Sequence, residues 1–369
     1  MSFLRPTQAG EFVYARLLGT GGIGTGMLFQ LSGGHTLGRN ESRLGMLLPN
    51  LDFCKLHVIA HYMAVLLGAG KGHFDMHALG KVGDDVAGRE LVNMMREAGI
   101  DVSSVDVLPG YPTLFSVCFQ YPDTTGGNIT SMNSASGLVS GLDVARFFAR
   151  LPKDGRREMV LAAPEVKVEA RIAMLALGRQ RGSFTVASVL SGEAAQFHEQ
   201  GVWKNIDLLA VNIDEARAIA GIGEDGCLSD EAAEACIQEL VLQNPDMRIA
   251  ITDGPKGSYG YHQGVSTFTP ALPAKAIGTA GAGDAYVAGV MAGLCCGLPF
   301  LKQAREASFG GTPLYSAMEL GTLLASFSVT SPDTIHMEAD AKALFTYAKE
   351  RNICFSPDFA RMFDGEGSL

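Results

Sequence analysis

The chain lacks the marks of several protein classes. It has 29 Lys and Arg against 39 Asp and Glu, a formal net charge of −10, so a broad surface for nucleic acid or anionic membrane is not expected. Its seven cysteines include no CxxC pair, which argues against a zinc or disulfide framework and fits a reducing compartment. No apolar run is long enough to span a bilayer, and the first residues have no signal-peptide core. We therefore expect a soluble, cytoplasmic protein with no nucleic-acid or membrane partner.

Three common catalytic motifs are also missing. Gly68-Ala-Gly-Lys-Gly72 contains a Gly-Lys pair but no Ser or Thr after the lysine, as a Walker P-loop would require. The HExxH zinc motif and the GxSxG hydrolase motif do not occur. The 369 residues are 47% hydrophobic and only 18% charged, so the chain is a folded globular protein whose function must come from other segments.

Short apolar runs alternate with helical patterns through the middle of the chain. Candidate buried strands lie at 159–163, 183–189, 208–211 and 249–252, with helical spacing of apolar residues between them. This alternation predicts βαβ units and a mainly parallel sheet, in which ligands bind at the carboxyl ends of the strands. No linker divides the chain, so we predict a single domain over residues 1–369.

The most informative segment is Gly278-Thr-Ala-Gly-Ala-Gly-Asp284, which runs into a small-residue apolar helix. Gly281, Ala282 and Gly283 allow a tight turn at a helix start, where free amides and the helix dipole form an anion site. Asp284 places a carboxylate beside that site, where a hydroxyl could lose its proton while a phosphoryl group is held. The alternative is that Asp284 is an ordinary helix N-cap.

Two further loops follow predicted strands. Asn212 and Glu215 are three residues apart at a helix start, so they form a pair that orders the water shell of Mg²⁺, a capping box, or both. Thr252, Gly254 and Gly257 lie in a loop whose glycines let the backbone approach a nucleotide, although Pro-Lys-Gly also suits a plain β-turn.

A competing signal lies near the N-terminus. Gly19, Gly21 and Gly24 match GxGxxG after a predicted strand, as in an NAD(P)-dependent oxidoreductase. A dinucleotide fold needs a long helix directly after these glycines, and Ser32-Gly-Gly34 interrupts the following apolar segment early. We rank this hypothesis second.

Together these segments resemble the ribokinase-like, or PfkB, family of carbohydrate kinases. Thr279 and Gly281–Asp284 match the family's C-terminal signature, and Asn212 with Glu215 matches its Asn-x-x-Glu motif. Gly80-Lys-Val-Gly-Asp-Asp85 agrees with a further family segment in order and spacing. The likeness covers about residues 55–330.

The resemblance implies an α/β fold with a doubly wound, mainly parallel sheet flanked by helices and a small β lid. We expect lid segments near residues 25–50 and 110–135, and a tail that frays over 355–369. The implied activity is transfer of the ATP γ-phosphate to a hydroxyl of a sugar or sugar-like molecule, with Mg²⁺ as cofactor. Lid-mediated dimers are common in this family, so a homodimer through the lid is a further expectation.

The family's functional residues can be carried over position by position. Asp284 would be the base, and the amides of Gly281, Ala282 and Gly283 would form the anion hole. The residues that would line the nucleotide are Thr252, Gly254, Gly257 and Thr279. Asn212 and Glu215 would support the phosphates and hold Mg²⁺ through water.

The chain departs from the family pattern in its acceptor half. Gly278 stands where the family usually has an Asp of a monovalent-cation loop, so we do not assume cation activation. The run Gly19–Gly26 replaces the usual early Asn or Asp that contacts the substrate. We therefore expect acceptor contacts rebuilt from Gly22, Thr25, Arg39, Asn40 and His57. A nucleoside acceptor and a catalytically silent ligand binder remain alternatives.

Overall fold

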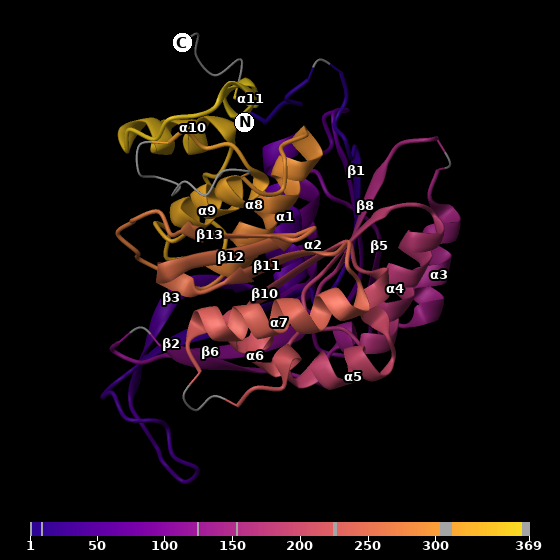
Figure 1. Cartoon of the computed structure of the whole chain (residues 1–369). Helices are drawn as coiled ribbons and strands as arrows, with labels where there is room; N and C mark the ends of the chain where they lie inside the picture. The colour runs from indigo at the N-terminus through magenta and orange to yellow at the C-terminus, as the bar shows by residue number, and fades with distance from the viewer. Residues whose placement is uncertain are drawn as a thin grey trace.

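The structure is a computed structural model that describes residues 2–8, 10–123, 125–152, 154–223, 227–302 and 312–363. A large sheet with helices on both of its faces forms the body, and a small separate sheet projects from one end (Figure 1). The predicted α/β architecture with a lid is therefore confirmed.

The large sheet is doubly wound. Its nine strands have the order β13-β12-β11-β10-β9-β8-β1-β4-β5. All pairs are parallel except β11–β12 and β12–β13, which are antiparallel. Its strands are Arg16–Thr20 (β1), Asp75–Gly83 (β4), Asp101–Leu108 (β5), Glu158–Ala162 (β8), Phe184–Ala187 (β9), Leu208–Asn212 (β10), Arg248–Thr252 (β11), Gly257–His262 (β12) and Val265–Pro270 (β13). The winding reverses at β1, which lies between β8 and β4. The expected ligand site is therefore at the carboxyl ends of these strands.

Helices pack against both faces of this sheet (Figure 1). The α-helices are Lys55–Leu67 (α1), Val86–Glu97 (α2), Gly141–Arg150 (α3), Val168–Gln180 (α4), Ala194–Glu199 (α5), Ile213–Ala220 (α6), Ser229–Gln243 (α7), Ala282–Cys296 (α8), Ala317–Ser328 (α9), Ala341–Glu350 (α10) and Pro357–Arg361 (α11). Short 3₁₀ turns lie at Ala135–Leu138 (η1), Ser191–Glu193 (η2), Val202–Asn205 (η3) and Gly254–Lys256 (η4). None of the helices described is both long and apolar enough to cross a membrane.

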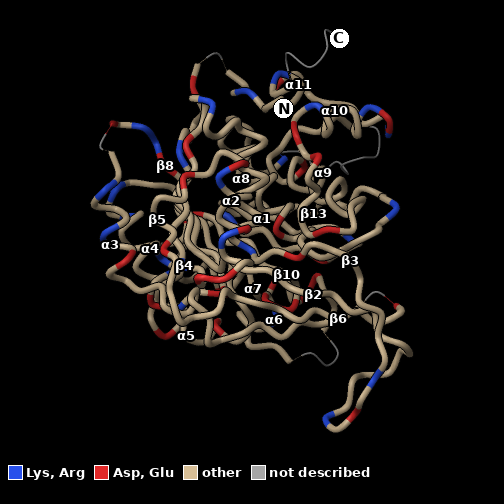
Figure 2. Tube along the Cα trace, turned by 180° about the vertical axis from the view of Figure 1, so that it is seen from behind, with Lys and Arg blue, Asp and Glu red and all other residues tan. Residues whose placement is uncertain are grey.

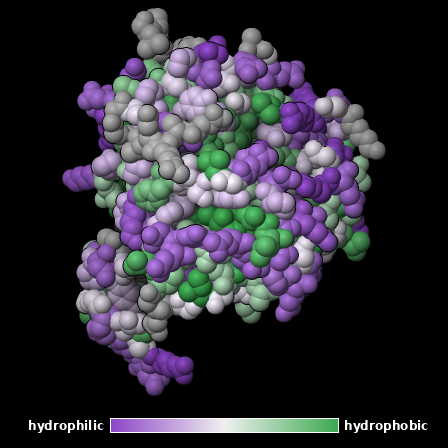
Figure 3. Space-filling view, in the orientation of Figure 1, coloured by the Kyte–Doolittle hydropathy of each residue, from purple (hydrophilic) through white to green (hydrophobic). Residues whose placement is uncertain are grey.

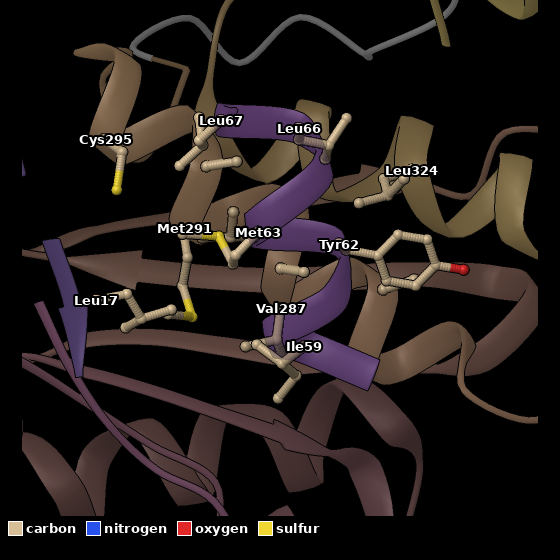
Figure 4. Close-up of a cluster of buried hydrophobic side chains, with 14 of the residues drawn as sticks. Leu17, Ile59, Tyr62, Met63, Leu66, Leu67, Val287, Met291, Cys295 and Leu324 are labelled. Atoms are coloured by element: carbon tan, nitrogen blue, oxygen red, sulfur yellow. The ribbon is translucent and has the colours of Figure 1, made fainter. Parts of the chain in front are cut away.

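Helices α1 and α8 are apolar around their whole circumference because they lie inside the molecule, between the sheet and α9. Figure 4 shows Ile59 and Met63 of α1 against Val287 and Met291 of α8. Every residue of α1 after Lys55 is buried. This packing holds the N-termini of both helices in fixed positions, which matters because both N-termini enter the candidate site.

The small sheet has four strands in the order β3-β2-β6-β7. They are Gly24–Leu31 (β2), Gly45–Phe53 (β3), Leu114–Gln120 (β6) and Gly126–Thr130 (β7), in the neighbourhood of the two predicted lid segments. The β2–β3 hairpin extends away from the body, and its tip is hydrophilic (Figures 1 and 3). We call this four-stranded sheet the lid.

Two expectations differ from the structure. After Gly24 the chain enters strand β2 of the lid and no helix follows, so the dinucleotide hypothesis for Gly19, Gly21 and Gly24 is wrong. The tail expected to fray from residue 355 forms helix α11, whose Phe359 is fully buried, while residues 364–369 lie outside the described part of the chain.

Figure 2 shows acidic and basic residues interspersed along the chain, which has a formal net charge of −10.

Candidate active site

The N-terminus of α8 is built around a glycine. Gly281 is the N-cap with φ of 77°, and a Cβ there would lie 2.4 Å from the carbonyl oxygen of Thr334, so only glycine fits. Asp284 is the third residue of the helix, and its side chain caps no backbone amide. The N-cap interpretation of Asp284 is therefore wrong, and its carboxylate is available for other contacts.

The first turn of α8 presents open backbone amides. Within the described residues no acceptor is found for the amides of Ala280, Gly281, Gly283 and Asp284. Gly283 is exposed, and no atom lies within 4 Å of the position of a Cβ there. Free amides at the positive end of a helix attract anions. This turn is therefore a cradle suited to a phosphate.

Lys55, the first residue of α1, closes the other side of this cradle. Its Nζ lies 3.2 Å from Oδ1 of Asp284, with the two side chains 30% and 13% exposed. The Asp284 carboxylate raises the pKa of Lys55 above its ordinary value, while burial opposes that effect. Lys55 is thus a cation at neutral pH. We did not predict a role for Lys55 from the sequence. Its position directly before the twelve buried residues of α1 is unusual for a lysine.

Glu165 is a second residue without a sequence motif. It follows β8 with φ of 73°, a left-handed backbone conformation that residues other than glycine rarely adopt. Its Oε2 accepts a hydrogen bond from the Lys55 amide at 3.1 Å. Gly22 leaves space for it, because a Cβ on Gly22 would lie 2.5 Å from the same oxygen. Burial raises the pKa of Glu165, and the Lys55 charge opposes this shift.

Asn212 and Glu215 form a capping box at the start of α6. The Asn212 amide donates to Glu215 Oε2 and the Glu215 amide donates to Asn212 Oδ1, both at 2.8 Å. The described residues provide no hydrogen-bond partner for Glu215 Oε1, so one carboxylate oxygen stays open. Burial raises the pKa of Glu215, and Lys55 opposes the shift, which shows that Glu215 shares the electrostatic environment of the Lys55–Asp284 pair.

The loop after β11 lies beside this capping box, because Asn212 and Thr252 are partners in the β10–β11 ladder. Gly254 begins the 3₁₀ turn η4 with φ of 52°. Gly257 has φ of 139°, and a Cβ there would lie 2.2 Å from the carbonyl oxygen of Thr269. The glycines are thus needed for the turn itself, and the loop ends at the same edge of the sheet as Asn212.

The five residues expected to contact the acceptor lie in different surroundings. Arg39 and Asn40 are exposed in the β2–β3 hairpin, and Thr25 pairs with Phe53 in the lid. His57 is fully buried, with its ring centroid 4.8 Å from that of Phe53, and we leave it out of the site. Gly22 contacts the candidate site, where it faces Glu165.

No complete metal cage exists among the described residues, since no group of three or more His, Cys, Asp or Glu side chains could hold an ion. Single open carboxylate oxygens, such as Glu215 Oε1, are present instead. That arrangement fits Mg²⁺, which keeps several waters and is bound through one or two carboxylates and the phosphates of a substrate.

Comparison with known proteins agrees with this geometry. The family model of pfkB family carbohydrate kinases matches residues 59–341. A deoxyribokinase of Salmonella typhi is 23% identical over 270 residues, which are 73% of this chain and 80% of that protein.

Two solved structures share the fold. A Burkholderia thailandensis nucleoside kinase in complex with inosine superposes with a TM-score of 0.67 at 17% identity, over 90% of this chain and 97% of the other. A putative ribokinase II of E. coli in complex with ATP and Mg²⁺ gives 0.66 at 12% identity, over 91% and 99%. The chain therefore belongs to the pfkB family of carbohydrate kinases, which are phosphotransferases with an alcohol acceptor.

Proposed function

We propose that this protein transfers the γ-phosphate of ATP to a hydroxyl group of a sugar or sugar-like molecule, with Asp284 as the base. The observation that carries the proposal is the position of Asp284, whose carboxylate lies within the first turn of α8 beside open amides and against the Lys55 ammonium. One side of this arrangement suits a phosphoryl group and the other a hydroxyl.

In the proposed mechanism Asp284 accepts the proton of the acceptor hydroxyl as its oxygen bonds to the γ-phosphorus. The bond from that phosphorus to the β-phosphate oxygen breaks, and ADP leaves. The open amides of Gly281 and Gly283 stabilise the charge on the transferring group, whereas the Ala282 amide, expected to join them, already donates to the carbonyl oxygen of Thr279 at 3.3 Å. Lys55 neutralises further charge and orients the Asp284 carboxylate through the 3.2 Å contact.

We assign the nucleotide to the loops at the carboxyl ends of β10 and β11 and to the start of α8. Its lining residues are Thr252, Gly254, Gly257 and Thr279. Asn212 and Glu215 would hold Mg²⁺ through water. When bound there, Mg²⁺ would neutralise phosphate charge. The E. coli structure with ATP and Mg²⁺ supports this choice of cofactors for a protein of the same fold.

The direct test is Asp284→Asn, which keeps the shape of the side chain and removes the base. We expect kcat to fall by about 10³-fold with every acceptor, since general-base catalysis contributes roughly 10²–10⁴-fold. ATP binding, measured by calorimetry, should stay within a few-fold of the native value. A panel of sugars and nucleosides phosphorylated equally well by both proteins would refute the role of Asp284. A native protein that binds ATP but turns over no acceptor would be a silent binder.

A nucleoside is the second candidate acceptor. The fold of this chain covers 97% of the nucleoside kinase that was solved with inosine, and this likeness keeps nucleosides in the acceptor panel. Gly278 offers no carboxylate to a monovalent cation, so we expect turnover in buffers without such ions. We also propose that the protein works in the cytoplasm and forms a homodimer through its lid.

A further inference from the structure

The lid has two chemically different faces. In strands β2, β3 and β6 the register places Gly26 beside Asp52 and Ser116. Side chains alternate between the faces of a sheet, so Asp52, Ser116 and Cys118 share one face with Gly26. Asp52 and Cys118 are half-buried and Ser116 is buried, whereas Val117, on the other face, is 36% exposed. We call the face with Asp52 the inner face.

The Asp52 carboxylate occupies space that the missing side chain of Gly26 leaves open. Its Oδ2 lies 2.2 Å from the position that a Cβ on Gly26 would occupy, so a larger residue at 26 would displace it. The same oxygen accepts a hydrogen bond from the Cys118 thiol at 3.5 Å. Across the described residues no Lys, Arg or His forms an ion pair with Asp52, and burial raises its pKa. Hydrogen bonds from the Cys118 thiol and the Phe53 amide lower the pKa of Asp52 but do not cancel the effect of burial, so the carboxylate has capacity for a further donor.

Asp52 belongs to the same electrostatic cluster as the proposed catalytic residues. It lies three positions before Lys55, and the Asp284 charge contributes to the rise in the pKa of Asp52. The Cys54 and Cys118 thiols both have raised pKa values to which Asp52 and Glu165 contribute, after burial as the first cause. The two glycines Gly22 and Gly26 thus make room for two carboxylates, Glu165 and Asp52, that come from other parts of the chain.

We propose that Asp52 contacts the acceptor, accepts a hydrogen bond from one of its hydroxyl groups, and selects for an uncharged polyhydroxylated acceptor over an anionic one. This inference rests on the proposed kinase function. It also explains where the carboxylate missing from the Gly19–Gly26 run is supplied: from strand β3, across the lid, instead of from the end of β1.

The charges of the candidate site support this substrate class. Asp52, Glu165, Glu215 and Asp284 are all acidic, and Lys55 is the cation paired with Asp284. Burial lowers the pKa of Arg171, and the charges of Glu193, Glu165 and Glu215 oppose this shift. Its guanidinium is held by Glu193 and by the carbonyl oxygen of Ser188. A sugar acid or sugar phosphate would therefore meet excess negative charge, whereas a neutral sugar would donate hydroxyl protons to it.

The test is Asp52→Asn, assayed with D-ribose, 2-deoxy-D-ribose, D-fructose and inosine as neutral acceptors and with D-gluconate and fructose 6-phosphate as anionic ones. For the best neutral acceptor we expect KM to rise about 10- to 100-fold, the effect of losing a hydrogen bond to a charged group. The KM for ATP should not change. The preference of the native enzyme for neutral over anionic acceptors should narrow in the variant.

Asp123→Asn is the matched control, because it makes the same change in the lid at an exposed turn where, among the described residues, the carboxylate accepts hydrogen bonds from the amide and hydroxyl of Thr125. It should leave both KM values unchanged. A loss of stability in Asp52→Asn would move kcat and the KM for ATP as well, so the split between the two KM values separates contact from folding. An unchanged acceptor KM in Asp52→Asn, or a native preference for anionic acceptors, would overturn the inference. Either result would leave the proposed function standing as long as Asp284→Asn is inactive.

Discussion

Lys55 is the residue on which the charge balance of the site depends. Its ammonium is the cation paired with Asp284 and is close enough to Glu165 and Glu215 for both to raise its pKa. We predict that Lys55→Met lowers kcat by about 10²-fold or more, because a fixed cation beside the transferring phosphoryl group stabilises the transition state more than the ground state. Steady-state kinetics with saturating ATP and acceptor would measure this.

Lys55→Arg is the control for this prediction, since it keeps the charge while changing the shape of the donor. It should retain more activity than Lys55→Met. A native kcat in Lys55→Met would show that the ion pair with Asp284 is structural only. A large drop in both variants would show that the geometry of the ammonium matters as much as its charge.

Only part of the site could be read from the sequence at the residue scale. Asp284 lies in a glycine-rich segment whose spacing has a physical meaning, so it was predicted. Lys55, Glu165 and Asp52 carry no such local signature. They meet only because β1, β8 and the lid bring residues more than a hundred positions apart into one place, as in the 3.1 Å bond from the Lys55 amide to Glu165.

Helix α1 carries two histidines with an unusual consequence for stability. His57 and His61 are buried in its apolar surface, and neither ring nitrogen of His57 has a partner among the described residues. Burial lowers the pKa of His57 to about 3, helped by His61, and burial lowers the pKa of His61 to about 4. Both rings are therefore neutral in the folded protein and take up protons on unfolding below about pH 6.5.

The sign of the pH dependence follows from these shifts. Stability is complete above the unfolded pKa and falls as pH drops toward the folded values, by about 1.4 kcal/mol per histidine at pH 5.5. We predict that the double variant His57→Leu/His61→Leu loses most of this acid sensitivity. Urea unfolding at pH 7.5 and pH 5.5 would measure the difference. His35→Gln, in the exposed β2–β3 hairpin, should keep the native pH dependence, and a double variant as acid-sensitive as the native protein would contradict the assignment.

Elements were predicted best where one local rule decided them. The capping box of Asn212 and Glu215 formed as their spacing predicted, because cap and partner lie within one turn. The GxGxxG pattern led to the wrong fold because a required glycine shows only that the backbone is closely packed, and it does not show what packs against it. Here a Cβ on Gly19 would lie 2.9 Å from Leu56, one on Gly21 would lie 2.7 Å from Ala163, and one on Gly24 would lie 2.4 Å from the carbonyl oxygen of Leu114 in the lid.

At the scale of the whole molecule, strand–helix alternation predicted the parallel sheet but not its strand order. The order depends on pairings such as β1 with β8, which join Arg16 to Glu158 and leave no trace in local spacing. The lid was expected from family resemblance, and its outer face could be described only from the structure. Met27, Val117 and Ile129 lie side by side across β2, β6 and β7 and are 45%, 36% and 70% exposed.

This apolar row gives the last prediction. Exposed contiguous apolar side chains on a sheet are a mark of an interface, so we predict that the protein is a dimer through the lid and that Val117→Lys/Ile129→Lys shifts it to a monomer. Sedimentation velocity at micromolar concentration would measure the shift. Leu242→Lys on α7, which is 81% exposed before the change, should leave the dimer intact. The two lid substitutions lie on the face opposite Asp52, so the monomer should still bind ATP, while a native protein that sediments as a monomer would contradict the prediction.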